Sequence, residues 1–141
     1  MSFAQTHAIN DVCVLCSDIE ASIRFYRDKL GFSLSHRAPG FADFRGAGLT
    51  LALWERGHIH ANTGVAMASS STGVCIAVKL PDAATLDAVY AELSAKGVPF
   101  VGPPAVYPWN AQGAYFTGPD GEVWEIYAWR EGGPIGAVDR P

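Results

Sequence analysis

One carboxylate, Glu125, stands where its side chain could do chemistry. It follows Gly-Pro-Asp-Gly at 118–121, where Pro119 presets φ and the glycines accept positive φ, as a tight turn requires. The alternation of Val123, Glu125 and Tyr127 then predicts a strand with these side chains on one face. Glu125 is therefore a candidate general base, metal ligand or polar anchor for a bound molecule. The alternative is that it only hydrogen-bonds a buried amide or hydroxyl.

Histidine and cysteine offer less chemistry. His58 and His60 lie two residues apart in a segment, 55–72, whose composition is typical of a loop. From a loop they could reach a cavity as ligands or as an acid and a base, although a solvated loop is the commoner outcome. Cys13 and Cys16 lie in or at the end of a predicted strand, where positions i and i+3 face opposite sides, so we interpret them as core residues.

Large aromatic side chains fall on or beside the strands expected around Glu125. The candidate ligand-binding aromatics are Trp54, Tyr107, Trp109, Tyr115 and Tyr127. An apolar wall with few polar groups suits a flat or hydrophobic small molecule, and aromatic faces add stacking. The alternative is that these rings fill the core. Arg45 and Arg56 are candidate anchors for an anionic ligand.

The first half of the chain is predicted to hold a strand, a helix and three further strands. Asp18 is typical of a helix N-cap, and Gly31 of a helix end. The expected strands are 9–15, 32–36, 41–45 and 49–54.

The second half repeats this order. Asp82 is the expected cap of a helix that Gly97 ends. The expected strands are 73–80, one that begins at 98–101 and is broken by Pro103 and Pro104, 114–116, and 122–129. Asp82 and Tyr90 follow Asp18 and Tyr26 at the same spacing of 64 residues, which suggests a duplicated module. Both tyrosines are interpreted as packing against the sheet.

The repeat predicts an α+β fold of two tandem βαβββ modules that form a half-open barrel with the helices outside, because one such unit cannot bury both faces of its sheet. The expected organisation is a single domain with modules at about 8–57 and 73–130, a linker at 58–72 and a tail at 131–141.

Three segments resemble the vicinal oxygen chelate superfamily of glyoxalases, bleomycin-resistance proteins and extradiol dioxygenases. They are residues 14–32, with the pattern D-x-x-x-S-x-x-F-Y followed by L-G-F; residues 93–98, Leu-Ser-Ala-Lys-Gly-Val; and residues 118–125, with P-D-G-x-x-W-E. The resemblance covers about residues 8–129 and implies the two-module fold. It is less specific for function, because the same scaffold serves enzymes and binding proteins.

Enzymes of this superfamily hold a divalent metal inside the barrel, with ligands from the first and last strands of each half. The matching positions are Asp11, Ala52, Cys75 and Glu125. Alanine has no ligand atom, and a site without histidine is unusual for Fe(II), Ni(II) or Zn(II). The resemblance therefore implies an incomplete metal site and no cofactor, with bound Fe, Ni, Zn or Mn as the alternative.

Composition excludes several classes of partner. With 49% apolar and 17% charged residues, the chain can build a core. A net charge of −4 and the lack of a basic run argue against nucleic acid and anionic membranes. The three cysteines, without a predicted export signal, favour reduced thiols in the cytoplasm.

Three functions remain open. The first is a metal-free protein that binds a small apolar or aromatic molecule, as a resistance or sequestering protein would. The second is a metal-dependent glyoxalase-type lyase, isomerase or dioxygenase acting on vicinal oxygens, with Glu125 as ligand. The third is a metal-free lyase or isomerase with Glu125 as general base. Exposed strand edges also favour a homodimer.

Overall fold

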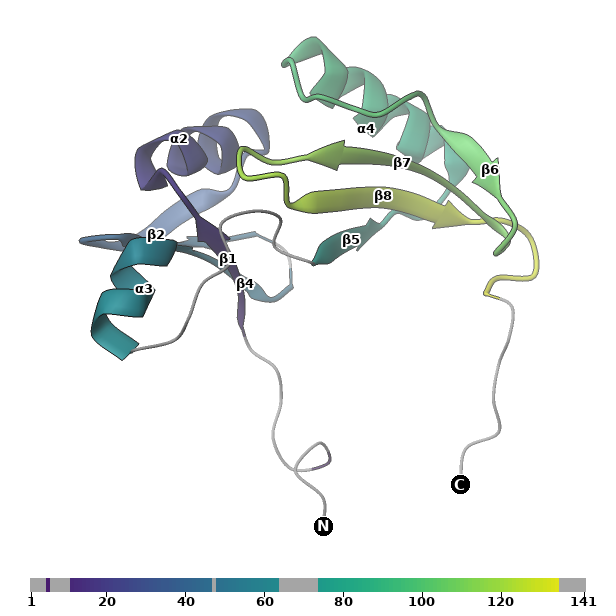
Figure 1. Ribbon diagram of the computed structural model, residues 1–141. Coiled ribbons are helices and arrows are strands. Elements are labelled where there is room, and N and C mark those ends of the chain that lie inside the picture. The colour runs from purple at the N-terminus through teal and green to yellow at the C-terminus, as the bar shows by residue number, and fades with distance from the viewer. Residues whose placement is uncertain (1–4, 6–10, 47, 64–73, 135–141) are drawn as a thin grey trace. The chain divides into compact units, whose positions relative to one another are not determined.

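The chain divides into two compact units, Met1–Thr72 and Gly73–Pro141. A computed structural model describes residues 5, 11–46, 48–63 and 74–134 (Figure 1). Each unit is built on one four-stranded mixed sheet, so the fold is α+β as expected. Residues 6–10, 64–73 and 135–141 lie outside the described residues, together with most of the predicted linker, the end of the predicted tail and the predicted start of the first strand.

The first sheet is formed by β1 (Asp11–Cys16), β2 (Ser33–Ala38), β3 (Phe41–Arg45) and β4 (Thr50–Glu55). The strand order is β1-β4-β3-β2, with β1 parallel to β4 and the other neighbours antiparallel. A parallel pair needs a crossover connection, and here the helix after β1 supplies part of it. This is the strand, helix and three strands that the sequence predicts.

That helix begins as predicted, because the Asp18 carboxylate accepts a hydrogen bond from the backbone N–H of Ala21. It runs as α2 (Ile19–Arg24) and then widens into a π-helical turn, η1 (Phe25–Lys29), which the sequence did not predict. Gly31 follows with φ of 79°, the left-handed conformation that ends helices and that glycine adopts without strain.

The two faces of the first sheet differ. Leu51, Leu53 and Phe44 are buried on the face that packs against α2 and η1 with Tyr26. Side chains on these strands alternate, so Thr50, Ala52 and Trp54 lie on the opposite face. We call that opposite side the open face of the first sheet.

Residues Arg56–Thr63 form a helix, α3, where the sequence predicted a loop. The cause lies in contacts that composition does not reveal. His58 packs so closely over Gly40 that a Cβ at Gly40 would overlap the imidazole, and Trp54 Nε1 donates a hydrogen bond of 2.9 Å to His58 Nδ1. The contact with Gly40, in the turn between β2 and β3, therefore holds α3 against the sheet.

The second sheet repeats the first. It contains β5 (Cys75–Lys79), β6 (Ala105–Tyr107), β7 (Ala111–Thr117) and β8 (Val123–Trp129), in the order β5-β8-β7-β6. β5 is parallel to β8, and the others are antiparallel. Helix α4 (Ala83–Ala95) lies across β7 and β8 (Figure 1).

Both ends of α4 agree with the sequence prediction. The Asp82 carboxylate accepts a hydrogen bond from the N–H of Thr85, and Gly97 has φ of 81° after the last turn. Leu86 of the helix and Trp124 and Ile126 of β8 are buried. They form the core of this unit on the covered face of the sheet.

The predicted strand at 98–101 is wrong. Only Phe100 pairs there, in an isolated bridge to Phe116, and the edge strand is the later β6. Proline lacks an N–H donor, so regular strand pairing begins only after Pro103 and Pro104, at β6.

The hairpin between β7 and β8 forms as predicted. Gly118 N–H donates to Glu122 O at 2.9 Å, and Gly121 has φ of 79°. The Glu122 side chain is 1% exposed and folds back to accept a hydrogen bond of 2.9 Å from the Asp120 N–H. A Cβ at Gly118 would overlap this carboxylate, so the turn requires glycine there for space. The sequence did not predict this role for Glu122.

No helix in the described residues is long and apolar enough to cross a membrane.

Candidate functional site

Glu125 lies on the uncovered side of the second sheet. In β8, Trp124, Ile126 and Ala128 are buried beneath α4, and the alternating residues Glu125, Tyr127 and Trp129 are only half-buried. The register pairs Glu125 with Tyr115 and Tyr127 with Gly113 across β7. We call this side the open face of the second sheet; residues from β5, β6, β7 and β8 contribute to it.

Glu125 and Tyr115 form the polar centre of this face. The Tyr115 hydroxyl donates a hydrogen bond to Glu125 Oε2. Burial, followed by this bond and the charge of Glu125, raises the pKa of the Tyr115 hydroxyl well above its usual range. The phenol therefore stays protonated at neutral pH and acts as a donor that fixes the orientation of the carboxylate.

Aromatic rings surround this pair. The Tyr107 and Trp109 rings stack with centroids 4.8 Å apart at 11°, and Tyr107 meets Tyr115 edge-on at 5.6 Å. Tyr127 and Trp129 make a further edge-on pair at 5.3 Å. Four of the five aromatic residues proposed from the sequence as ligand-binding are thus gathered in one unit, on or beside one face.

Gly113 sits among these rings. A Cβ at this position would lie 3.8 Å from Tyr107 Cε2, 3.5 Å from Tyr127 Cβ and only 3.2 Å from the Ile126 carbonyl. Because Gly113 has no side chain, the surface of the sheet stays shallow between Tyr107 and Tyr127. The sequence analysis missed both Gly113 and Trp129 as candidate site residues. The continued alternation after Tyr127 could have indicated Trp129.

The proposed metal positions can be placed only within each unit. In the first sheet Ala52 pairs with Cys13, whereas Asp11 pairs with Thr50, two residues earlier on both strands. In the second sheet Glu125 pairs with Ala77, while Cys75 pairs with Val123. Asp11 and Cys75 thus lie two residues from the strand neighbours of Ala52 and Glu125, about 6–7 Å along the strand.

The chemistry of these donors is also unfavourable for metal. Although part of Cys13 is open to solvent, burial and then the Asp11 carboxylate raise the pKa of its thiol to about 11. Partial burial and Glu125 raise the pKa of Cys75. A raised pKa makes each thiol a poorer metal ligand, because a metal ion must displace a more tightly held proton. Within the described part of either unit, no three His, Cys, Asp or Glu side chains form a group able to hold a metal ion.

The remaining predicted residues lie in the first unit. Trp54 is on the open face of the first sheet, near Phe41, and donates to His58 Nδ1. Arg56 Nη1 donates a 2.9 Å hydrogen bond to Leu15 O, which ties α3 to β1. Arg45 is exposed and donates from Nε to Ser35 Oγ at 3.0 Å.

The chain matches the family model of the Glyoxalase/Bleomycin resistance protein/Dioxygenase superfamily over residues 8–126. It belongs to this superfamily. The resemblance seen in the sequence motifs is thereby confirmed, and it extends over most of both units. No curated protein matches the chain.

Several solved structures share the fold of this chain. A glyoxalase/bleomycin resistance protein/dioxygenase from Nocardioides is 48% identical, with a TM-score of 0.89 over 94% of this chain and 90% of its own. A glyoxalase-related enzyme from Fulvimarina pelagi is 26% identical, with a TM-score of 0.75 over 94% and 95%. A lactoylglutathione lyase from Agrobacterium tumefaciens shares the fold at 21% identity, with a TM-score of 0.71 over 86% and 92%.

The superfamily's usual divalent metal does not fit the four matching positions, Asp11, Ala52, Cys75 and Glu125. Ala52 offers no ligand atom, partial burial and Glu125 raise the pKa of the Cys75 thiol, and one oxygen of Glu125 is bonded to Tyr115. Fe, Ni and Zn sites favour imidazole ligands, whereas the four positions supply two carboxylates, Asp11 and Glu125, and no imidazole.

Proposed function

We propose that this protein binds a small, flat apolar or aromatic molecule on the open face of the second sheet, without a complete metal site. The observation that carries the proposal is the Tyr115–Glu125 hydrogen bond at the centre of a face built from aromatic rings. Ligand sites in proteins combine a mostly apolar wall with a few fixed polar groups, which is the composition of this face.

Glu125 supplies the polar recognition. Tyr115 donates to Oε2, and Oε1 has no hydrogen-bond partner within the residues that the structure describes. A carboxylate oxygen accepts and cannot donate, so it selects a ligand that carries an N–H or O–H group. Because Tyr115 already holds the carboxylate in place, the ligand need not order it, which favours binding.

The rings supply the apolar area. Trp109 is 43% exposed even though it stacks on Tyr107, so one of its faces is available for a second planar partner. Tyr107 and Tyr127 flank the low point at Gly113. A planar molecule resting there would contact both tyrosines and reach toward Glu125. Aromatic pairs of this kind contribute about 0.5–1.5 kcal/mol each beyond the buried area.

A calorimetric titration tests this assignment. The probe is 2-naphthol, which has a planar ring system and one hydroxyl donor, and the comparison compound is 2-methoxynaphthalene, which has the rings without the donor. We expect 2-naphthol to bind about tenfold more tightly than 2-methoxynaphthalene, because one hydrogen bond to a charged acceptor contributes roughly 1.4 kcal/mol, which corresponds to about a tenfold change in Kd. The Glu125→Ala variant should remove this difference.

The matched control is Glu92→Ala, because Glu92 is an exposed carboxylate on α4 beside Lys96. It should bind both probes as the native chain does. Equal binding of the two naphthalenes by the native chain would refute the role of Glu125. Binding that appears only after Fe(II), Ni(II), Zn(II) or Mn(II) is added would instead support the metal-dependent enzyme.

A further inference from the structure

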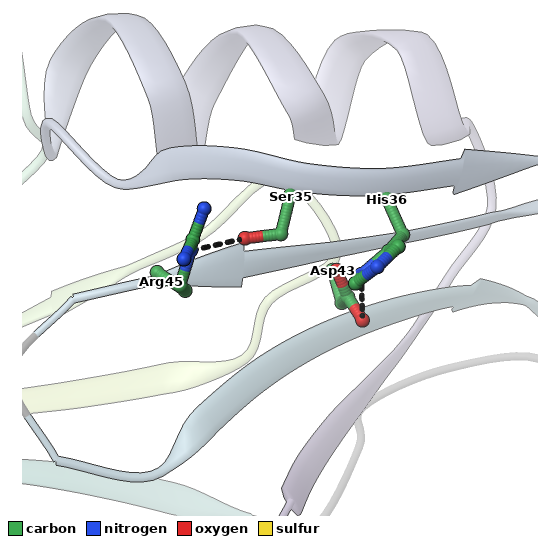
Figure 2. A network of polar contacts seen from close by, with 4 residues as sticks. All are labelled: Ser35, His36, Asp43 and Arg45. Carbon is green, nitrogen blue, oxygen red and sulfur yellow. Dashed lines mark hydrogen bonds and ion pairs between the residues drawn. The ribbon is translucent and has the colours of Figure 1, made fainter.

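A second group of polar side chains lies in the first unit, whereas Glu125 and its aromatic rings belong to the second. Ser35, His36, Asp43, Arg45 and Thr50 line a hollow of about 290 Å³ on the open face of the first sheet. Figure 2 shows the first four of these residues and the contacts between them. All the lining residues come from the neighbouring strands β2, β3 and β4. Apart from Arg45, none of them belongs to the site proposed from the sequence, so the function proposed above leaves this hollow unexplained.

A β-bulge creates the hollow. Leu34 pairs with Phe44, but the next pair in register is His36 with Asp43, so Ser35 is an extra residue in β2. Consecutive side chains of a regular strand alternate between faces, whereas a bulge interrupts this alternation. Ser35 and His36 therefore both point to the open face, toward Arg45 and Asp43 respectively (Figure 2).

Asp43 fixes the imidazole of His36. Its two carboxylate oxygens lie 2.8 Å and 3.1 Å from His36 Nδ1. A carboxylate only accepts, so Nδ1 must carry the proton and Nε2 is the free nitrogen of the neutral ring. The His36 side chain is 79% exposed, which leaves Nε2 accessible to a ligand. Asp43 is thus a positioning residue.

Ser35 fixes the guanidinium of Arg45 in the same way. The bond of 3.0 Å from Arg45 Nε to Ser35 Oγ orients the planar group. Within the described residues, the terminal nitrogens of Arg45 have no carboxylate partner, in contrast to Arg37 on β2, which pairs with Glu20. An oriented and unpaired guanidinium presents a fork that matches a carboxylate with two parallel hydrogen bonds.

The charges around the hollow limit what it can hold. Arg45 is positive, Asp43 is negative and bonded to His36, and Asp11 of β1 lies beside Thr50. The whole chain carries a net charge of −4, so long-range attraction does not concentrate anions here. Local hydrogen bonds must therefore provide the affinity, and two nearby carboxylates disfavour a ligand with more than one negative charge.

We infer that this hollow is a second ligand site that takes a small monocarboxylate. Arg45 binds the carboxylate through its terminal nitrogens, while Thr50 and His36 contact the rest of the molecule. A hollow of about 290 Å³ has room for a small ligand.

The test uses the intact protein labelled with ¹⁵N. Cyclohexanecarboxylate is titrated at about 0.1 M salt, which screens weak surface attraction, and the Arg45 Nε–H resonance reports binding by NMR. This probe has no aromatic ring and no donor, so it does not satisfy Glu125. The neutral isostere cyclohexanecarboxamide provides the comparison. We expect the carboxylate to bind at least about tenfold more tightly than the amide.

Variants locate the effect. Arg45→Gln should weaken carboxylate binding about tenfold or more, while Arg37→Gln, the matched control on β2, should change it by less than about twofold. Circular dichroism should show both variants folded, because both side chains are exposed. Glu125→Ala should leave carboxylate binding unchanged, which separates this inference from the proposed function.

Three results would overturn the inference. The first is equal binding of the carboxylate and the amide. The second is an equal loss in the Arg37 and Arg45 variants, which would indicate a general charge effect. The third is tighter binding of inorganic phosphate than of the carboxylate, since a dianion should be disfavoured beside Asp11 and Asp43.

Discussion

Coupling between Tyr115 and Glu125 is the most direct quantitative test of the proposed site. A hydrogen bond to a charged group contributes about 1.5–3 kcal/mol when buried. Both side chains are only half-buried, so water competes for the carboxylate and a value of about 1 kcal/mol is expected. The pair lies between directly paired positions of β7 and β8, so this energy should stabilise the two central strands of the second sheet.

A double-mutant cycle of Tyr115→Phe and Glu125→Ala measures that energy. Because the chain contains two compact units, global unfolding is a poor assay, and amide hydrogen exchange of β7 and β8 is preferable. Each single variant should increase the opening equilibrium of these strands, and the coupling should correspond to roughly a fivefold effect.

The control cycle replaces Tyr115→Phe with Tyr90→Phe. Tyr90 packs edge-on against Phe100 at 4.7 Å and is distant in the fold from Glu125, on the helix side of the sheet. Its coupling with Glu125→Ala should lie within about 0.3–0.5 kcal/mol of zero, the range expected for independent sites. If the Tyr115 cycle gives an equally small value, the hydrogen bond does not organise this face, and the reasoning is refuted.

Three further predictions follow from other residues. Gly118→Ala should destabilise the second unit by about 2–3 kcal/mol, because the new Cβ displaces the buried Glu122 carboxylate. Gly121→Ala, with open space around it, should cost only about 1 kcal/mol of backbone strain. Equal losses in the two variants, measured by amide hydrogen exchange of β7 and β8, would contradict this. With a pKa of about 11, the Cys13 thiol should be about 0.1% thiolate at pH 8, against about a quarter for an ordinary thiol. Peptide mapping should therefore find that iodoacetamide alkylates Cys13 roughly 100-fold or more slowly in the folded than in the unfolded chain, and the rate in the folded chain should rise about tenfold per pH unit. Equal rates at pH 8 would show that this thiol is not shielded. Elemental analysis of protein purified without chelators should find well below one Fe, Ni, Zn or Mn per chain, and one equivalent would contradict the donor argument based on Ala52.

Local rules explain what could be predicted from the sequence. Asp18 and Asp82 cap helices, and Gly31, Gly97 and Gly121 adopt positive φ, because each effect depends on a few adjacent residues. Alternation along β8 likewise placed Glu125 and Tyr127 on one face, opposite Trp124. These features need no knowledge of a distant strand.

Pairing between distant segments explains what could not be predicted. The register of β1 on β4 sets Cys13, rather than Asp11, beside Ala52, and no local pattern fixes such a register. Helix α3 depends on the contact of His58 with Gly40, in the turn between β2 and β3, and these two segments meet only in the folded unit. The sequence analysis missed the hollow lined by Ser35 and His36, because an extra residue in β2 cannot be recognised until the partner strand is known.

The extra residue Ser35 also bears on how related proteins could diverge. Removing the Ser35 codon would restore regular alternation along β2, with Leu34 still opposite Phe44 and His36 still opposite Asp43, and would take away the hydroxyl that orients Arg45. A scaffold of this kind could thus gain or lose a carboxylate pocket in a single deletion or insertion, with its hydrophobic interior intact. Comparing chain lengths between η1 and β3 among relatives would therefore separate those able to build the hollow from those that cannot, before any binding is measured.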